Sequence, residues 1–312
     1  MRMNWISTGA KFLLPALLLL GACSDDRPTD SPTQGEAKIS VDESVRPLVE
    51  SMVFVYESSY PETKLTAAYQ PEGKVLNDVL KDSTVQVGVL CRDLTEEEKK
   101  YLDARGYTPT TLKIAEDAVA LIVNRENPDS LITQEQLARI LEGKDSLWKS
   151  LNAQSALGGI NVVFDEQGSA NARYLSEKLL KGKPFAPNCF ALKSNPAVID
   201  YVAAHPGALG IISVNWISDK DDSVCMSRRQ KVKVVSVKGS DSTGFVPPWQ
   251  TYIGDASYPF HREIWIVKIG QRTSLGTGFV SFAANERGQL IILKSGLVPA
   301  RQPERRIELK TF

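Results

Sequence analysis

The strongest constraint on the fold is a regular alternation of apolar strand patterns and amphipathic helix patterns along most of the chain. Strands and helices in this order are the signature of an α/β protein with mainly parallel sheets. The predicted strands are Lys64–Tyr69, Val85–Leu90, Asp117–Asn124, Gly159–Phe164, Ala208–Val214, Lys231–Val237 and Glu263–Ile269.

Two of the intervening helices have ends that can be read from the sequence. Thr95 and Glu98 form a capping box that begins one helix, and Gly106 closes it. The same pattern begins another helix at Thr133, and that helix ends at Gly143. The helices are therefore separate, short and well delimited.

The size of the chain favours two lobes. Residues 37–312 number 276, more than the roughly 100 to 200 residues of one ordinary domain. Thr111–Asn124 is long and mostly apolar, as expected of a strand that passes from one lobe to the other. The Pro-rich and aromatic stretch Phe245–Pro259 suits a return crossing.

The N-terminal residues predict export and lipidation. Basic residues precede the apolar run Phe12–Leu20, which is shorter than the roughly 20 residues needed to span a bilayer but suits a secretory signal. The run ends in Leu20-Gly21-Ala22-Cys23, which resembles the lipobox of bacterial lipoproteins. We therefore expect residues 1–22 to be a signal peptide, and Cys23 to carry the lipid that anchors the chain to a bacterial membrane.

Residues 23–36 predict a flexible tether, because they are polar and rich in Asp, Ser, Thr and Pro. Asp25 and Asp26 are either a solvated start to this tether or an acidic export signal of the kind that sends lipoproteins to the cell surface. The predicted location is the cell envelope, on the periplasmic side or the outer surface.

Charge and cysteine content restrict the partners. The 37 basic and 37 acidic side chains balance, so the composition indicates no nucleic-acid partner. Export to an oxidising compartment allows a disulfide between Cys189 and Cys225, and the alternative is that both thiols are reduced and partly buried. Cys91 has no obvious mate, and no cluster has metal-ligand spacing, so neither a metal nor another cofactor is expected.

Several segments, taken together, resemble the phosphate-binding proteins of Pst-type ABC importers. They occur in the family's order and spacing, and they are Glu116–Pro128, Leu131–Leu137, Glu142–Lys144, Trp148, Gly207–Ile211, Tyr258-Pro259, Gly288-Gln289 and Val298-Pro299. The resemblance implies a type II periplasmic binding protein fold, with two α/β lobes joined by crossing strands and a ligand held between them. The expected lobes are residues 37–115 with 259–312, and residues 116–258.

The resemblance also implies places where an anion would bind. Ser44 matches the family's phosphate-binding Thr at a helix start, but Asp42 and Glu43 depart from the pattern there. Asp42 suits a helix N-cap, whereas Glu43 would repel a phosphate that it faced. Arg92 matches a variable position after a strand, where it either meets the anion bidentately or pairs with the acidic helix that follows.

A third place is the turn before a helix in the second lobe. Gly168 and Ser169 match the family's phosphate-binding turn, in which backbone N–H groups and hydroxyls meet the anion at a helix N-terminus. Asp165 stands where the family has its Arg, and Asn171 replaces a Thr. Arg173 lies one helical turn on from Ala170. It is expected to place a positive charge at the same turn and so to replace the family's Arg.

Glu72 occupies a loop where the family has a Gly-rich helix start. It either favours the dipole end of that helix or faces the ligand. The second alternative gives a mixed set of carboxylates and guanidiniums, which suits a ligand with both donors and acceptors, or a self-paired ion network, better than dianionic phosphate.

The leading hypothesis is therefore a lipid-anchored extracytoplasmic binding protein that delivers phosphate or a related oxyanion to an ABC permease. The alternative is a non-transport envelope lipoprotein that uses the same fold to bind another ligand or a protein partner. An enzyme is not expected, because neither His205 nor His261 lies near a nucleophile motif and the sequence has no P-loop of the nucleotide-binding kind and no metal motif.

Overall fold

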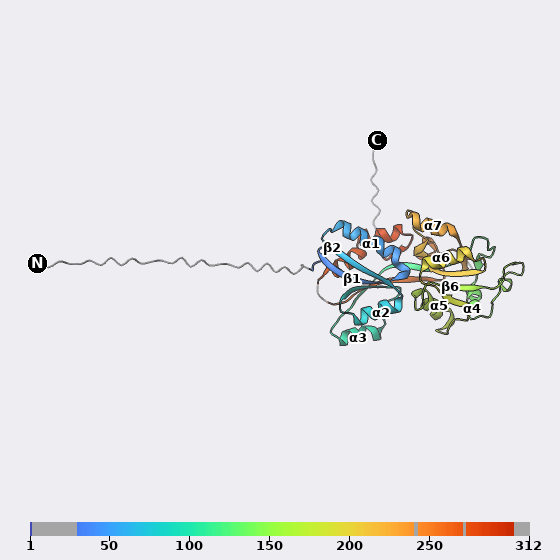
Figure 1. Cartoon of the computed structure of the whole chain (residues 1–312), viewed down its shortest axis with the longest axis horizontal. Helices are drawn as coiled ribbons and strands as arrows, with labels where there is room; N and C mark the ends of the chain where they lie inside the picture. The colour runs from blue at the N-terminus through green and yellow to red at the C-terminus, as the bar shows by residue number, and fades with distance from the viewer. Residues whose placement is uncertain (2–29, 240–242, 271–272, 303–312) are drawn as a thin grey trace, which may run out of the picture.

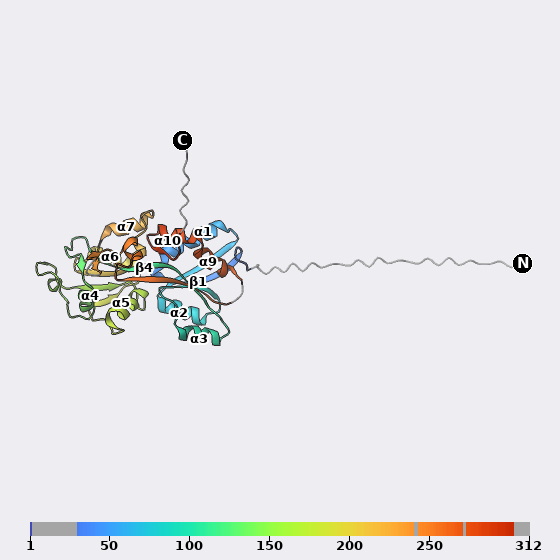
Figure 2. The same ribbon diagram turned by 180° about the vertical axis from the view of Figure 1, so that it is seen from behind.

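The protein forms two lobes that lie side by side along its long axis (Figure 1). The computed structural model describes residue 1 and residues 30–239, 243–270 and 273–302. The predicted signal peptide, Cys23 and most of the predicted tether lie outside these residues. Figure 2 shows β4 running from one lobe into the other, with α9 and α10 beside α1 in the first lobe.

The helices divide between the lobes. The first lobe has α1 (Arg46–Ser59), α2 (Glu72–Lys81), α3 (Glu96–Ala104), α9 (Leu275–Ala284) and α10 (Glu286–Lys294). The second has α4 (Gln134–Leu141), α5 (Ala170–Leu180), α6 (Asn195–Ala204) and α7 (Ser223–Lys231), and α8 (Gln250–Gly254) packs against strands β4 and β13.

The first lobe is built on strands in the order β2-β1-β3-β12-β4. Strands β2 and β3 both run parallel to β1, while β12 runs antiparallel to β3 and β4. The bounds are β1 (Gly35–Asp42), β2 (Thr63–Gln70), β3 (Val85–Leu90), β4 (Thr110–Asn124), β12 (His261–Lys268) and β13 (Val298–Pro299).

The second lobe continues from the other half of β4 in the order β4-β8-β6-β7, with β9 also paired to β4. Its strands are β6 (Asn161–Phe164), β7 (Cys189–Ala191), β8 (Ala208–Ser213) and β9 (Val232–Val234). A separate small sheet has the order β11-β10-β5, with β5 (Leu131–Ile132), β10 (Ser236–Lys238) and β11 (Phe245–Val246).

Strand β4 joins the lobes. It pairs with β12 as far as Ala118 and with β8 from Val119 onward, so one continuous strand serves both sheets. Val119–Val123 are fully buried, which explains why the sequence there is apolar on both faces. The predicted crossing strand and the two-lobed α/β fold are confirmed, although parallel pairing is confined to the outer strands of each sheet.

The return crossing was predicted within Phe245–Pro259, with the first lobe resuming at residue 259. Phe245–Pro259 contains β11 and α8, and the chain returns to the first lobe only at its end, where β12 begins at His261. The predicted boundary therefore lies within two residues of the start of β12.

Local predictions agree with the structure. Both capping boxes are present, at Thr95 and at Thr133. Gly106 and Gly143 follow their helices with φ of 80° and 74°, which glycine adopts without steric cost. The predicted strand Lys231–Val237 is wrong as a single element, because Val235 separates β9 from β10 and these join different sheets.

Among the described residues, no helix is both long enough and apolar enough to cross a membrane. The apolar side chains of the two lobes instead form one continuous core that runs through β4, with a smaller cluster under α2 and α3.

Candidate functional site

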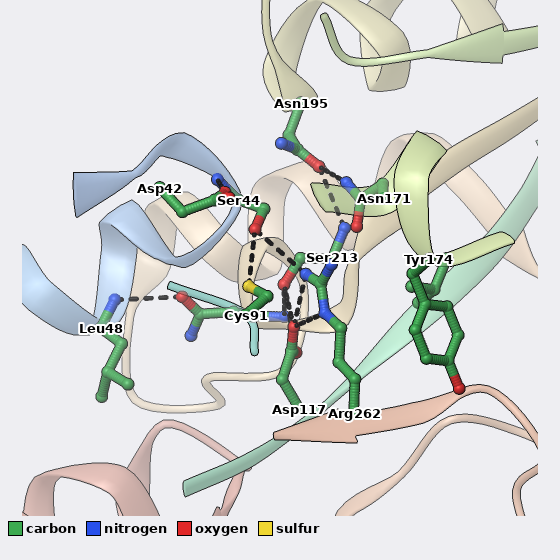
Figure 3. Close-up of polar contacts among 12 residues, drawn as sticks. Asp42, Ser44, Leu48, Cys91, Asp117, Asn171, Tyr174, Asn195, Ser213 and Arg262 are labelled. Carbon is green, nitrogen blue, oxygen red and sulfur yellow. Dashed lines mark hydrogen bonds and ion pairs between the residues drawn. The ribbon is translucent and has the colours of Figure 1, made fainter. Parts of the chain in front are cut away.

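Polar side chains gather where the two lobes meet, although most of them are fully buried (Figure 3). They come from the end of β1, from the starts of α5 and α6, and from the crossing strands β4 and β12. Because buried polar groups carry a cost unless they are paired, such a cluster needs a structural or functional reason.

The first-lobe side of the cluster is the turn after β1. Asp42 caps the short helix η1 (Glu43–Val45), its Oδ1 accepting a hydrogen bond of 2.8 Å from the Ser44 backbone N–H. The Ser44 hydroxyl lies 3.4 Å from Cys91 Sγ and accepts a 3.0 Å hydrogen bond from Arg262 Nη2. Ser44 therefore lies in the interlobe cluster, at the place where the sequence predicted it.

The crossing strands supply a buried ion pair that the sequence analysis missed. Arg262 on β12 donates to Asp117 Oδ2 from Nε at 3.1 Å and from Nη2 at 2.8 Å. Their side chains are 1% and 0% exposed. Asp117 also accepts from the Ser213 hydroxyl at 2.9 Å. The sequence did contain a signal for this pair. Side chains alternate between the two faces of a strand, so Arg262 lies on the same face of β12 as the buried Ile264 and was a candidate for a buried basic residue.

The predicted anion-binding turn of the second lobe closes around Asp165. Its carboxylate accepts hydrogen bonds from the Ser169 hydroxyl at 2.6 Å, from Asn171 Nδ2 at 2.9 Å and from Asn195 Nδ2 at 3.2 Å. Ser169 also caps α5, accepting from the Ala172 N–H at 3.2 Å. The acid that replaces the family's Arg is thus held by the residues expected to hold the ligand.

Gly168 precedes this cap with a φ of 77° and is exposed. Its carbonyl accepts a 3.4 Å hydrogen bond from the backbone N–H of Gly73 in the first lobe. The turn therefore touches the opposite lobe through its backbone, and Gly168 lies at the rim of the cluster rather than inside it.

Glu72 and Arg173 pair across the two lobes. Arg173 Nε and Nη2 both donate to the Glu72 carboxylate, the second at 3.2 Å. Glu72 also accepts from the Cys91 backbone N–H at 3.1 Å, and it is 3% exposed. Arg173 does reach the mouth of the cluster as predicted, but there it neutralises Glu72.

A second polar link joins the lobes beside this pair. Asn195 at the start of α6 donates from Nδ2 to Glu43 Oε2 at 2.6 Å. The Asn195 side-chain oxygen accepts from the Ser213 backbone N–H at 3.0 Å. Closure of the lobes is therefore held by polar contacts from several elements.

Of the two roles predicted for Arg92, the structure shows the ion pair with the acidic helix that follows it. Its guanidinium forms a bidentate pair with Glu98 on α3, at 2.8 and 2.7 Å. Glu98 is also the acidic member of the capping box begun by Thr95. The guanidinium is held by its own lobe, so we do not propose it as a ligand contact.

The buried carboxyls have altered acidity. Burial, together with the nearby Glu72, raises the pKa of Asp42 to about 8. Burial likewise raises the pKa of Glu43 to about 7, although the hydrogen bond from Asn195 opposes the shift. Burial also raises the pKa of Asp165. The cluster is therefore rich in groups that resist carrying negative charge.

Four side-chain atoms of the cluster have no hydrogen-bond partner among the described residues. They are the donors Arg262 Nη1 and Asn215 Nδ2 and the acceptors Asn171 Oδ1 and Asp42 Oδ2. Buried polar atoms without a hydrogen-bond partner are uncommon in folded proteins, and each one needs an explanation. A ligand bound between the two lobes would supply partners for these atoms.

Of the two alternatives left open for Cys189 and Cys225, the structure has the reduced one. Cys189 on β7 and Cys225 on α7 are both free thiols, as the alternative reading had it. Cys91 is free and buried, and burial raises its pKa well above the ordinary value, so it behaves as a small apolar side chain rather than a nucleophile. The part of the chain that the structure describes holds no group of His, Cys, Asp and Glu able to ligate a metal ion.

Comparison with known proteins finds a matching family model and several similar proteins. A family model described as a PBP superfamily domain matches residues 26–287. A protein of Staphylococcus saprophyticus described as phosphate-binding protein PstS is 26% identical over 270 residues, 86% of this chain and 81% of that protein. A PstS of Staphylococcus aureus is 25% identical over 284 residues, 88% of this chain and 83% of that protein.

Solved structures share the fold. A putative phosphate ABC transporter substrate-binding protein from Clostridium perfringens, solved with bound phosphate, has a TM-score of 0.72 at 24% identity, covering 86% of this chain and 100% of that one. An ABC-type phosphate transport receptor from Vibrio cholerae has a TM-score of 0.63 at 23% identity, covering 84% of this chain and 99% of that one.

Proposed function

Because the chain belongs to the PBP superfamily, as its resemblance to phosphate-binding proteins predicted, we propose that it is a substrate-binding protein whose lobes close on phosphate or a related oxyanion. On this proposal it delivers the ligand to an ABC permease. The names of its relatives in two Staphylococcus species support phosphate as the ligand, and their naming as binding proteins supports binding rather than covalent chemistry.

The observation that carries the proposal is the unpartnered Nη1 of Arg262. Arginine keeps its charge in proteins, so a buried guanidinium N–H without an acceptor is costly. Asp117 occupies Nε and Nη2 and leaves Nη1 facing the interlobe cluster. An oxyanion oxygen there would complete the guanidinium with a charge-assisted hydrogen bond.

Other predicted contacts fit around this anchor. Ser44 lies beside the Arg262 guanidinium, and the start of α5 points its backbone N–H groups and helix dipole toward the same cluster. Ser169 and Asn171 are held by Asp165, and on this proposal they turn to the ligand when it enters. The set comes from both lobes and a crossing strand, so ligand binding and closure are coupled.

Isothermal titration calorimetry of the purified protein tests the proposal. Phosphate, arsenate and simple phosphonates would each be titrated, and we expect at least one to bind with a Kd below about 1 mM. Arg262→Gln should weaken that binding at least a hundredfold, whereas Arg92→Gln should leave it within about threefold. If none of these oxyanions binds at millimolar concentration, the proposed function is wrong although the fold stands.

We also propose that Cys23 carries the membrane anchor. The support is the lipobox-like sequence Leu20–Cys23 after its short apolar run. A lipid there, with a flexible tether after it, would hold the binding lobes near a permease at high effective concentration. Metabolic labelling with a fatty-acid analogue should mark the wild-type chain but not Cys23→Ala, and equal labelling of both would refute the anchor.

A further inference from the structure

The charge balance of the interlobe cluster is unusual for a site that takes only an anion. Glu72 and Asp117 are paired with arginines, on α5 and β12 respectively. Asp42, Glu43 and Asp165 have no ion pair of their own among the described residues, although all three lie in the same cluster. The cluster thus holds more carboxyl groups than guanidiniums.

The unpartnered atoms of the cluster include both acceptors and donors. Asp42 Oδ2 and Asn171 Oδ1 are acceptors without donors, and they come from opposite lobes. Arg262 Nη1 is a donor without an acceptor, and it comes from the crossing strand between them. Asn215 Nδ2 adds one further donor at the same junction, where its side-chain oxygen accepts from the Leu48 N–H at 3.0 Å.

Figure 3 shows how these groups lie. The Arg262 guanidinium projects between Ser44 and Asn171, and Asp42 lies beside Ser44 on the first-lobe side. The phosphate dianion HPO4²⁻ has a single O–H, so besides the donors of the site it satisfies at most one of the two acceptors. It would leave the other acceptor unpaired and would add negative charge beside uncompensated carboxyls.

On the premise that the cluster binds an oxyanion, we propose that its ligand is a small zwitterion that joins a phosphonate or phosphate group to an ammonium group. An ammonium has three N–H donors and no acceptor, so it complements Asp42 and Asn171. The oxyanion complements Arg262. The ammonium also lowers the net negative charge that the carboxyl-rich cluster has to accommodate.

Burial is consistent with this assignment. It raises the pKa of Asp42 and Glu43, so without a cation these carboxyls tend to take up protons instead. An ammonium would restore their ionised forms, and binding would then release protons rather than consume them. That difference can be measured once the protons gained or lost by the ligand's own oxyanion are subtracted, because an anion without an ammonium favours the protonated carboxyls instead.

The test compares 2-aminoethylphosphonate with ethylphosphonate by calorimetry on the purified protein at pH 7. The two share the oxyanion and the alkyl chain and differ in the ammonium. We expect 2-aminoethylphosphonate to bind at least tenfold more tightly, with protons released in a comparison of two buffers of different ionisation enthalpy. Asp42→Asn and Glu43→Gln should each reduce that preference to below about threefold, whereas Asp200→Asn, at an exposed carboxylate that pairs with Lys231, should keep it.

Two outcomes would overturn the inference, and they differ in what else they imply. Equal or tighter binding of ethylphosphonate or inorganic phosphate would refute a zwitterionic ligand but leave the oxyanion site in place. Binding of none of the three compounds would refute the oxyanion site itself. Circular dichroism of each variant would show that it is folded, and agreement between the Asp42 and Glu43 variants guards against a local defect in either one.

Discussion

The buried pair between Asp117 and Arg262 gives a sharp prediction about stability. Asp117→Asn keeps the size of the side chain but removes the charge that faces Arg262 Nε and Nη2 at 3.1 and 2.8 Å. Arg262 cannot lose its proton, so the variant holds an uncompensated buried cation. Breaking a buried pair in this way costs about 3–5 kcal/mol of unfolding free energy.

Urea denaturation followed by circular dichroism measures the loss. With a urea dependence of about 3 kcal/mol per molar, the midpoint should fall by about 1 to 1.7 M. Asp200→Asn is the matched control, since Asp200 pairs with Lys231 at 2.6 Å but the two side chains are 62% and 46% exposed. Exposed pairs contribute about 0–1 kcal/mol, so this midpoint should barely move.

A double variant separates the pair from other effects of the substitution. Adding Arg262→Gln to Asp117→Asn removes the stranded cation and should recover part of the loss, with a coupling energy of about 2–3 kcal/mol. An Asp117→Asn protein within about 1 kcal/mol of wild type would contradict the reasoning, because it would mean that water or a counterion already reaches Arg262.

Three further predictions follow from other features. Burial holds the pKa of Asp42 at about 8 and of Glu43 at about 7 in the folded protein, above their ordinary values of 3.8 and 4.5, so the folded state binds more protons than the unfolded state. The contribution of these two groups to stability is full below about pH 4 and is lost as the pH rises through 8. Urea titrations at pH 5 and pH 8 should show this fall, and Asp42→Asn should remove most of it; an unchanged fall would show that Asp42 is not the group responsible. Gly210→Ala should cost about 1–3 kcal/mol, because its Cβ would lie 2.6 Å from Val202 Cγ2 and 2.7 Å from Ile122 Cγ1, while Gly158→Ala, with open space, serves as the neutral control. Alkylation of the denatured protein without reductant, followed by mass spectrometry, should modify Cys189 and Cys225 fully, and protection of both until reduction would restore the disulfide.

Much of the architecture was accessible from the sequence because the relevant signals are local. The capping boxes at Thr95 and Thr133 need only three following residues, and the apolar run that ends at Asn124 needs only its own composition. The pairing of Arg92 with Glu98 is also local, which is why it stood among the two predicted alternatives.

The centre of the candidate site was less accessible because its contacts are distant in sequence. Arg262 and Asp117 are joined only when β12 and β4 pair in register, and no local pattern near Arg262 names its partner. The resemblance pointed to Ser169 and Asn171 as ligand contacts, but it gave no sign that Asp165 binds both of them. Likewise, the link between Glu72 and Arg173 exists only because the lobes close on each other.

The most direct test of the account is calorimetric titration of the wild-type protein and of Arg262→Gln with the same oxyanion series, phosphonates included. The account predicts that at least one oxyanion binds the wild type with a Kd below about 1 mM and that the variant, while still folded, loses at least a hundredfold in affinity. An oxyanion that binds both proteins equally would contradict it, because the buried guanidinium between the lobes would then have no part in recognition.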